Sequence, residues 1–569
     1  FKSIARRDFL NGTALVLGGA VLGGSAQAHS PSEYPPALKG MRGHHPGSFE
    51  TMHAIRDGSF FKTAGAIQET REHYDLVVVG AGISGLAAAH FYRKALGAGR
   101  KVLVLDNHDD VGGHAKRNEF RHAGRTYLSF GGTMSIETPF PYSFTAKALL
   151  AELGVDPSSF ARYECKATFE GLGSGVFFNA EDFRADRVVA GFGQKPWGEF
   201  FSQAPLSEEV RDDLVRIHAE RIDYLPGLSP AEKARRLKHM SYATFLTAHA
   251  RLRTESLAFF RGEHFRNSMR LDSCPAFVAW RLGAAGFSGM EIEAEPLVHA
   301  EYFHFPDGNA SIARLLVNRL VPGSFGARLD QESIVLASLD YGALDQADSA
   351  VRIRLNSTAV QVEHIGTPDR ATEKAVSVTY AGGGRLNRVS AANVVLACFN
   401  NIIPFLVPSL PEAQRQALHY ASKVPMMYSS ALVRNWQPWK KLGVSRIAAP
   451  NGFHNHVQLD TPRGLVNVIH PALQARGYVD QVGRDPGPGQ AVLWGTTPQF
   501  LEKLGLDSIA DLPAIAEFIP GADVVEALEH GLRVPTTADR QAPAERTGGP
   551  QRSTPPEPAT PGGPAPSDG

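Results

Sequence analysis

The sequence of 569 residues is poor in cysteine and carries no excess of either charge. Its three cysteines, Cys165, Cys274 and Cys398, lie far apart, which argues against a disulfide framework or a CxxC zinc site and favours small core side chains. Lys plus Arg and Asp plus Glu both number 58, so no chain-wide basic field attracts nucleic acid or a membrane surface. Beyond the N-terminus no apolar run is long enough to span a bilayer. We expect a globular protein with no nucleic-acid partner and no membrane span once a leader is removed.

The first residues have the features of an export signal. Residues 6–10, RRDFL, form a twin-arginine pattern, although Ala5 stands where Ser or Thr is usual. A weakly apolar run over 13–24 follows, and residues 26–28, AQA, supply small side chains for cleavage. We expect residues 1–28 to be a twin-arginine signal peptide that directs the folded protein to the periplasm. An ordinary amphipathic N-terminus is the alternative.

A strand, a glycine-rich turn and a helix follow one another after residue 74. Residues 76–79, LVVV, predict a strand buried on both faces, and 85–95 have helical periodicity. Between them lies GAGISG, residues 80–85, and a second buried strand over 101–105 is followed at once by Asp106. This succession of strand, GxGxxG, helix, strand and acid predicts a dinucleotide-binding βαβ unit.

Each residue of this fingerprint has a physical reason. Gly80 permits the tight turn, Gly82 lets a pyrophosphate approach the backbone, and Gly85 lets helix and strand pack closely. The N-terminus of the helix presents free N–H groups and a partial positive charge to the phosphates. Asp106 can accept hydrogen bonds from the ribose hydroxyls. A glycine-rich turn without a ligand is the alternative interpretation.

Three further segments favour FAD over NAD. Residues 110–114, DVGGH, resemble the second signature of two-domain flavoproteins, including the amine oxidases. Residues 356–360, NSTAV, resemble the strand that brackets the adenine, and 393–398, NVVLAC, resemble the strand that closes the FAD domain. A site assembled from segments about 270 residues apart is usual in this superfamily. The residues predicted to hold the cofactor are Gly80, Gly82, Ser84, Gly85, Asp106, Asn107, Gly112, Gly113, His114, Gly131, Gly132, Val360 and Ala397.

Longer runs narrow the resemblance to one family. Residues 6–12, 74–93, 109–120, 302–322, 355–364 and 397–411 look like bacterial spermidine dehydrogenases, and the resemblance covers about residues 1–460. It implies FAD-dependent oxidation of the secondary amine of a polyamine in the periplasm, with an unidentified electron acceptor. An amine oxidase that passes electrons to oxygen is a second interpretation.

The same resemblance implies haem as a second redox centre. The sequence has no CxxCH, so the haem would be a non-covalent haem b. Possible ligands are His44, His45, Met52 and His53, but a solvated surface position is favoured for each. The fragment His454-Asn455-His456 has no further ligands at useful spacing, and no other metal site is expected.

The chemistry belongs to the flavin, so no acid–base residue is required and none is assigned. By resemblance, residues 131–133, GGT, run beside the isoalloxazine ring. An aromatic wall for ammonium groups and an acidic patch for the ends of a polycation are two further hypotheses, with core packing and a solvated face as their alternatives. The aromatic candidates are Tyr428, Trp436 and Trp439, and the acidic ones are Glu291, Glu293 and Glu295.

The C-terminal part does not continue this pattern. Residues 473–518 resemble the C-terminal part of segregation and condensation protein B, a winged-helix subunit of the bacterial chromosome-condensing complex. Short strands at 478–479 and 491–494 flank the turn 485–487 and predict a wing hairpin. The flavin family's usual last segment, which returns to the flavin, is not found. We expect two proteins joined between about 458 and 472; a divergent flavoenzyme C-terminus is the alternative.

The sequence thus predicts an α/β, two-domain, Rossmann-like FAD-binding flavoprotein with an inserted substrate domain. Residues 29–72 are expected to form an extended lead-in. The expected divisions are a signal peptide (1–28), a first FAD-binding part (74–140), a substrate domain (141–350), a second FAD-binding part (351–411), a truncated substrate-domain segment (412–460), a partial winged helix (465–540) and a disordered Pro/Gly-rich tail (541–569).

Overall fold

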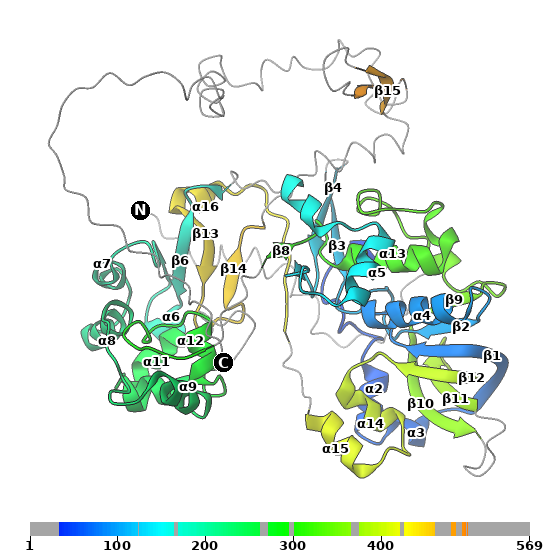
Figure 1. The fold of residues 1–569 in the computed structure, drawn as a ribbon, viewed down its shortest axis with the longest axis horizontal. Helices are drawn as coiled ribbons and strands as arrows, with labels where there is room; N and C mark the ends of the chain where they lie inside the picture. The colour runs from blue at the N-terminus through cyan, green and yellow to red at the C-terminus, as the bar shows by residue number, and fades with distance from the viewer. Residues whose placement is uncertain are drawn as a thin grey trace, which may run out of the picture. The chain divides into compact units, whose positions relative to one another are not determined.

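The computed structural model describes residues 34–122, 125–163, 169–261, 271–294, 301–365, 375–420, 426–460, 479–484, 492–496 and 498. The chain divides into two units, Phe1–Arg476 and Gly477–Gly569 (Figure 1). The signal peptide, the junction at 458–472 beyond residue 460, and the tail 541–569 lie outside the described residues.

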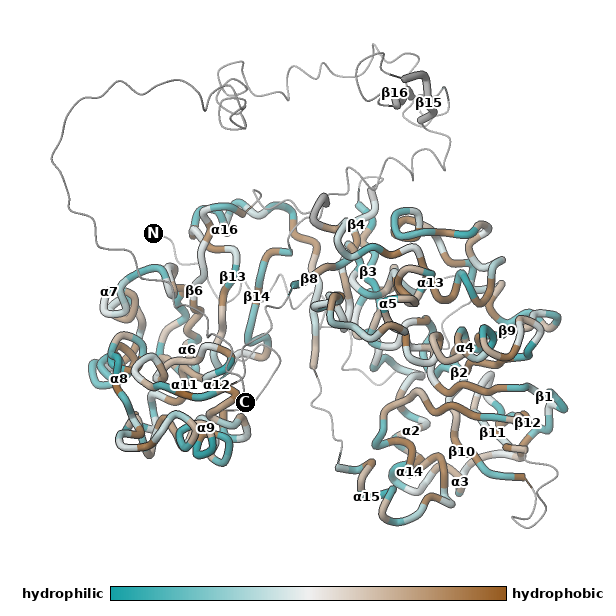
Figure 2. Tube along the Cα trace, viewed as in Figure 1, coloured by the Kyte–Doolittle hydropathy of each residue, from teal (hydrophilic) through white to brown (hydrophobic). Residues whose placement is uncertain are grey.

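The first unit contains a six-stranded sheet in the order β10-β11-β12-β1-β2-β9. Strands β12, β1, β2 and β9 run parallel, whereas β10 and β11 pair antiparallel with their neighbours. The last four residues of β1, Leu76 to Val79, and all of β2 are continuous apolar runs because both their faces are covered. Figure 2 shows this hydrophobic stretch along β1. The bounds are β1 (Ile67–Val79), β2 (Val102–Leu105), β9 (Val351–Arg354), β10 (Ser357–Ile365), β11 (Ala375–Gly382) and β12 (Arg385–Leu396).

Alternate residues of the central strands face two different cores. Leu76 and Val78 belong to a cluster with the helices α4 (Ile83–Leu96) and α13 (Ala310–Leu320). Val77 and Val79 face a second cluster that Leu406 of α14 (Ile403–Leu406) completes. This alternation follows from the two-residue period of a strand. It places α4 and α13 side by side on one face of the sheet.

The expectation of an extended lead-in is wrong for the described part of residues 29–72. This stretch contains the short helices η1 (Pro35–Ala37), α2 (Glu50–Arg56) and α3 (Phe60–Thr63), and β1 begins within it at Ile67. Ile55 of α2 is buried against Val360 of β10. Apolar residues at helical spacing therefore anchor a stretch that its polar composition made look like loop.

The predicted insert, residues 141–350, packs in two different cores. Its outer parts join the core of the sheet, and they include α5 (Phe144–Leu153), η2 (Pro157–Tyr163), β8 (Tyr302–Phe303), α13, η6 (Pro322–Phe325) and η7 (Tyr341–Ala343). Described apolar residues between Val176 and Met290 form a separate core rich in aromatic side chains. The small strands β3 (Arg117–His122), β4 (Arg125–Phe130) and β5 (Ile136–Glu137) precede the insert.

The separate core carries its own four-stranded sheet in the order β14-β13-β6-β7. Strands β13 and β14 come from the predicted segment 412–460; β13 pairs in parallel with β6 of the insert, and β14 pairs antiparallel with β13. Ser229 caps α9 in a capping box with Glu232. The bounds are β6 (Gly173–Phe178), β7 (Arg187–Ala190), β13 (Val444–Ala448), β14 (His456–Gln458), α6 (Ala180–Phe183), α7 (Trp197–Ser202), α8 (Glu208–Ala219), α9 (Pro230–Lys238), α10 (Tyr242–Thr244), η4 (Phe245–His249), η5 (Thr254–Ser256), α11 (Leu257–Phe260), α12 (Ala276–Arg281) and α16 (Gln437–Leu442).

The second unit contains one described hairpin. Strands β15 (Val479–Arg484) and β16 (Val492–Thr496) pair antiparallel, where the sequence predicted the two strands of a wing. The connecting turn at 485–487 lies outside the described residues. Within the part of the chain that the structure describes, no helix has the length and apolar character needed to cross a membrane.

Candidate cofactor site

The glycine-rich loop follows β1 directly, and each of its three glycines occupies a different environment. Gly80 has φ +111°, and a Cβ there would lie 2.6 Å from the carbonyl oxygen of Ala397. A Cβ on Gly85 would lie 1.9 Å from the carbonyl oxygen of Gly80. A Cβ on Gly82 would meet the nearest atom of the described residues at 3.8 Å. Gly80 and Gly85 are therefore required by the fold, whereas Gly82 leaves an open space over the loop.

Helix α4 begins at this loop with its N-terminus free for an anion. Gly82 is its N-cap residue, and within the described residues no side chain caps it. The first turn has no acidic residue, and Ser84 in that turn is exposed. Uncapped N–H groups together with the helix dipole attract negative charge. The geometry fits the phosphates of a dinucleotide.

The second glycine pair lies against the first loop. Gly112 N–H donates to the carbonyl oxygen of Ala81 at 2.8 Å, and Gly82 and Gly112 form a bridge. Gly112 has φ +102° and Gly113 φ +59°. A Cβ on Gly113 would lie 3.2 Å from the Cα of Gly82, so only small residues allow the two chain segments to run this close.

Asp106 has a structural role in addition to the ribose contact that its motif predicts. Its carboxylate is buried and accepts the backbone N–H of Ala81 at 2.6 Å and that of His108 at 2.8 Å. Each oxygen therefore already holds one backbone donor, with a second lone pair available to a ribose hydroxyl. The acid joins the glycine-rich loop to the loop after β2.

Replacing Asp106 by Asn is expected to lower the free energy of unfolding by about 1–3 kcal/mol, because one of the two buried N–H groups loses its acceptor. Chemical denaturation measures this change. The exposed Asp57→Asn is the control, and it should leave the free energy of unfolding unchanged. Equal effects of the two substitutions would contradict the role of Asp106.

The late segments arrive at the same end of the sheet. The N–H of Ser357, at the start of β10, donates to the carbonyl oxygen of Asp106 at 2.7 Å. The N–H of Ala397, directly after β12, donates to the carbonyl oxygen of Val79 at 2.8 Å. The side chain of Val360 is fully buried, in the cluster that also contains Ile55. The fold thus brings residues about 270 positions apart to one loop cluster.

The predicted flavin-ring segment lies beside the second glycine pair. Gly131 N–H donates to the carbonyl oxygen of Lys116 at 2.8 Å, and Gly132 N–H to that of His114 at 3.0 Å. The exposed ring of His114 packs edge-to-face with Phe399, whose own side chain is half exposed. This is the open end of the loop cluster, where a ring system could lie against polar backbone and aromatic edges.

Asn309 was not found by sequence reasoning, although it organises this segment. Its side-chain amide donates to Thr133 Oγ1 at 2.9 Å and to the carbonyl oxygen of Ser135 at 3.0 Å. Its neighbour Gly308 has φ +63°, and a Cβ there would lie 2.4 Å from the carbonyl oxygen of Thr133. The Asp307-Gly308-Asn309 turn before α13 was the available signal.

The candidates for the aromatic wall pack against different side chains. The exposed Tyr428 packs edge-to-face against Phe130, at a centroid distance of 6.2 Å. Trp436 packs instead against Phe169, at 5.5 Å. Of the acidic candidates, Glu291 and Glu293 are on the surface, and Glu295 lies outside the described residues. Trp439 lies in α16 beside Trp436.

The histidines of the lead-in are not all at the surface. His45 is only 5% exposed, and Met52 packs against two of the apolar clusters, so the surface interpretation is wrong for both. The ring of His44 stacks on Phe49 at 4.1 Å, and Phe49 also contacts His53. The two histidine rings are 5.6 Å apart and both contact Phe49, so they pack on an aromatic side chain and on each other, and we assign them no haem.

Burial lowers the pKa of His45 to about 4. The charge of Asp109 raises this pKa, while Arg42, His108 and Lys116 lower it further. The ordinary pKa of histidine is 6.5, so at pH values between 6.5 and about 4 the imidazole of His45 is protonated in the unfolded chain but neutral in the folded chain. The free energy of unfolding should fall as the pH drops through this window.

Substituting Gln for His45 is expected to make that pH dependence shallower. Denaturation midpoints between pH 7 and pH 4 measure the slope, with His44→Gln, an exposed neighbour, as the control. If His45→Gln and the unsubstituted chain give the same slope, the buried neutral state of His45 is refuted.

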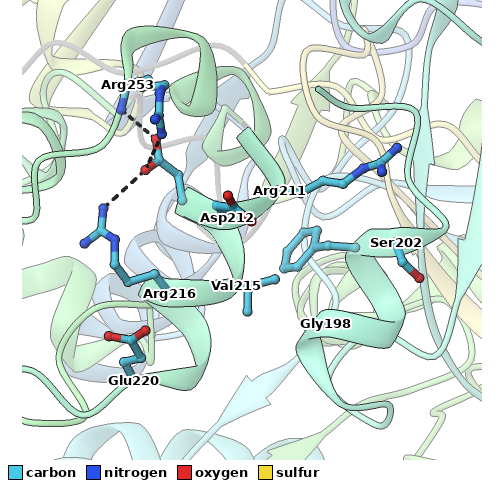
Figure 3. A pocket seen from close by; sticks show the side chains of 10 residues that line it. Gly198, Ser202, Arg211, Asp212, Val215, Arg216, Glu220 and Arg253 are labelled. Atoms are coloured by element: carbon cyan, nitrogen blue, oxygen red, sulfur yellow. Dashed lines mark hydrogen bonds and ion pairs between the residues drawn. The ribbon is translucent and has the colours of Figure 1, made fainter. Parts of the chain in front are cut away.

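A pocket beside the aromatic-rich core is separate from this site. It is lined by residues of α7 and α8 together with Glu220 and Arg253 (Figure 3). Its buried carboxylate, Asp213, is paired with Arg216 at 3.3 Å and with Arg253 at 2.9 Å. None of the predicted cofactor residues lines it.

The geometry defines a dinucleotide-binding fold, and comparison with known proteins agrees. Residues 78–153 match the family model of the NAD(P)-binding Rossmann-like domain. The predicted α/β Rossmann-like class is thereby confirmed. A solved putrescine oxidase double mutant is 19% identical, with a TM-score of 0.35, covering 69% of this chain and 73% of that one. A fatty acid isomerase from P. acnes is 13% identical, with a TM-score of 0.28, covering 61% and 63%.

The C-terminal part is similar to a different family. Residues 466–515 match the model of the segregation and condensation complex subunit ScpB. Segregation and condensation protein B of Bacillus pumilus is 44% identical over 59 residues, 10% of this chain and 29% of that protein. The Bacillus subtilis protein is 46% identical over 62 residues, 10% of this chain and 31% of that protein. The chain spans about a third of the length of these relatives, and the predicted likeness is confirmed.

Proposed function

We propose that this chain is an exported FAD-dependent oxidoreductase that oxidises a C–N bond of a polyamine such as spermidine. The observation that carries the proposal is the single loop cluster formed by residues 80–85, Asp106, 112–113, 356–360 and 397. Each of these segments corresponds to a part of the flavin site in the spermidine dehydrogenases that the sequence resembles. The match to the Rossmann-like family supports the nucleotide-binding half of the proposal.

The chain's own residues hold and orient the reactants. The N-terminus of α4 and the space over Gly82 receive the pyrophosphate, and Asp106 accepts the ribose hydroxyls. Residues 131–133 and the edge formed by His114 and Phe399 lie where the ring end would be. When bound, the flavin supplies the acceptor for a hydride from the carbon next to the amine nitrogen. No side chain is assigned as an acid or a base.

Turnover with defined amines and acceptors tests the reaction. Spermidine, putrescine and benzylamine are each offered with an artificial electron acceptor under nitrogen, and separately with oxygen alone. We expect spermidine with the artificial acceptor to give an aldehyde product. Turnover with oxygen alone would favour the second candidate, an amine oxidase, and benzylamine as the preferred substrate would refute the polyamine assignment.

Export is the second part of the proposal, and residues 6–10 support it. Replacing the Arg6-Arg7 pair by two lysines is expected to abolish accumulation in the periplasm, because this pair is the feature that identifies the leader as a twin-arginine signal. Cell fractionation followed by immunoblotting measures the distribution. Undiminished periplasmic protein after this replacement would contradict the assignment of the leader.

A chimeric or non-functional chain is the remaining candidate, and the segregation-protein likeness of residues 466–515 favours it. A partial winged helix has little core of its own, so we infer that it is a passenger without a chromosomal partner.

Removing residues 461–569 should then leave flavin binding unchanged. Loss of binding on removal would show that the C-terminal part belongs to the enzyme.

A further inference from the structure

Residues 42–48 of the lead-in, hereafter the clasp, hold the loop that follows β2. Arg42 Nη2 contacts both carboxylate oxygens of Asp109. The side-chain amide of Asn107 donates to the carbonyl oxygen of Ser48. The side chains of Arg42 and Asp109 are only 14% and 13% exposed, so this pair is poorly screened by solvent. The clasp and the loop are therefore bound to each other by charge and by a backbone carbonyl.

The loop held by the clasp is part of the candidate cofactor site. It begins directly after Asp106, whose carboxylate accepts the N–H of His108, and it leads into Gly112 and Gly113. The carbonyl oxygen of His108 accepts the N–H of Asn356 at 2.8 Å. The ribose end of the site is thus flanked by this loop and by the start of β10. Movement of the loop would displace the groups that face a ribose.

The clasp and the loop also bring two histidines together, and His108 Nδ1 lies 3.7 Å from Asp106 Oδ1. Among the described residues, Nδ1 of His45 and Nδ1 of His108 are buried without a hydrogen-bond partner. The two rings lie 5.8 Å apart, and His45 Nε2 is 3.6 Å from Asp109 Oδ1. Burying ring nitrogens that lack a hydrogen bond opposes closure. The pairing of Arg42 with Asp109 is the charged contact that offsets this cost, beside the hydrogen bond from Asn107 to Ser48.

We propose that the Arg42–Asp109 pair is a positioning device that keeps residues 42–48 closed over the ribose end of the bound dinucleotide and so slows its release. The inference rests on the proposed function, because it requires FAD as the ligand. Arg42 touches no reacting atom and acts through Asp109 on the loop after Asp106. Binding differences of this kind are expressed mainly in the dissociation rate.

The test measures FAD association and dissociation with the full chain, by quenching of flavin fluorescence in stopped flow. Arg42→Met keeps the length of the side chain and removes its charge. We expect it to raise the dissociation rate by about tenfold while leaving the association rate within about twofold. Arg42→Lys keeps the charge without the paired geometry and should lie between. Arg56→Met, an exposed position in the same lead-in, is the matched control and should change neither rate.

The proposal is wrong if Arg42→Met leaves the FAD dissociation rate unchanged. It is also wrong if the variant loses affinity only through a slower association rate. Should Arg42→Met fail to fold, Asp109→Asn and Arg42→Lys decide the question, because each must still accelerate release. An unsubstituted chain that binds no FAD at all would instead refute the proposed function. The two failures are therefore distinguishable.

Discussion

Gly82→Ala is expected to leave the protein folded but unable to retain its cofactor, whereas Gly85→Ala prevents folding. A methyl group at Gly85 would lie 1.9 Å from a backbone oxygen, and backbone cannot move aside. At Gly82 the nearest described atom would be 3.8 Å away, which is ordinary contact. The methyl group there occupies only the space that we assign to the pyrophosphate. We expect FAD affinity to fall at least about 100-fold, which is about 2.8 kcal/mol.

Thermal unfolding and flavin fluorescence, measured on the same samples, separate the two effects. Gly65→Ala is the control, because a Cβ there meets no described atom within 4 Å and its φ is not in the left-handed region. Gly82→Ala should match this control in melting temperature and differ from it in flavin content. A Gly82→Ala variant that keeps its flavin would refute the assignment of the pyrophosphate to the space over this loop.

Arg117→Met is expected to destabilise the chain by about 3–5 kcal/mol, because it removes the buried cation that pairs with two buried carboxylates. Arg117 bonds Glu119 on its own strand, donates to Asp307 Oδ2 at 3.1 Å and to the carbonyl oxygen of Val335 at 2.8 Å. The side chain of Asp307 is completely buried. The pair joins β3 to the turn whose Asn309 holds the predicted flavin-ring segment.

Arg121→Met is the matched control for this substitution. Arg121 lies on the same strand and approaches the same Glu119, at 3.8 Å, but its side chain is 66% exposed. Exposed pairs contribute about 0–1 kcal/mol, so urea denaturation should show little change. Comparable destabilisation by the two substitutions would mean that the buried pair of Arg117 and Asp307 stabilises the fold no more than an exposed pair does.

The nucleotide-binding loop could be predicted because its determinants are local. Two buried strands, three glycines and an acid at fixed spacing define the βαβ unit, and the helix begins within two residues of its expected start. The dual use of Asp106 could not be predicted, since the N–H groups that it accepts belong to loops brought together only by the sheet.

The structure of the lead-in could not be predicted from its amino-acid composition. Its polar residues suggested an extended chain, yet Ile55 and Met52 lie one helical turn apart and face apolar clusters. The partner of Arg42 lies 67 residues away along the chain. A contact at that separation leaves no periodic signal in a single sequence. A single sequence is equally silent on the packing partners of Tyr428 and Trp436. The two residues are close in sequence, yet Tyr428 packs against Phe130 and Trp436 against Phe169.

The absorbance spectrum of the purified chain, supplied with FAD and recorded before and after anaerobic addition of spermidine, tests the central claim most directly. We predict a bound-flavin spectrum that bleaches when spermidine is added, with Gly82→Ala showing no bound flavin. Bound flavin that spermidine leaves oxidised would contradict the polyamine assignment. A chain that is folded but retains no flavin would contradict the account as a whole.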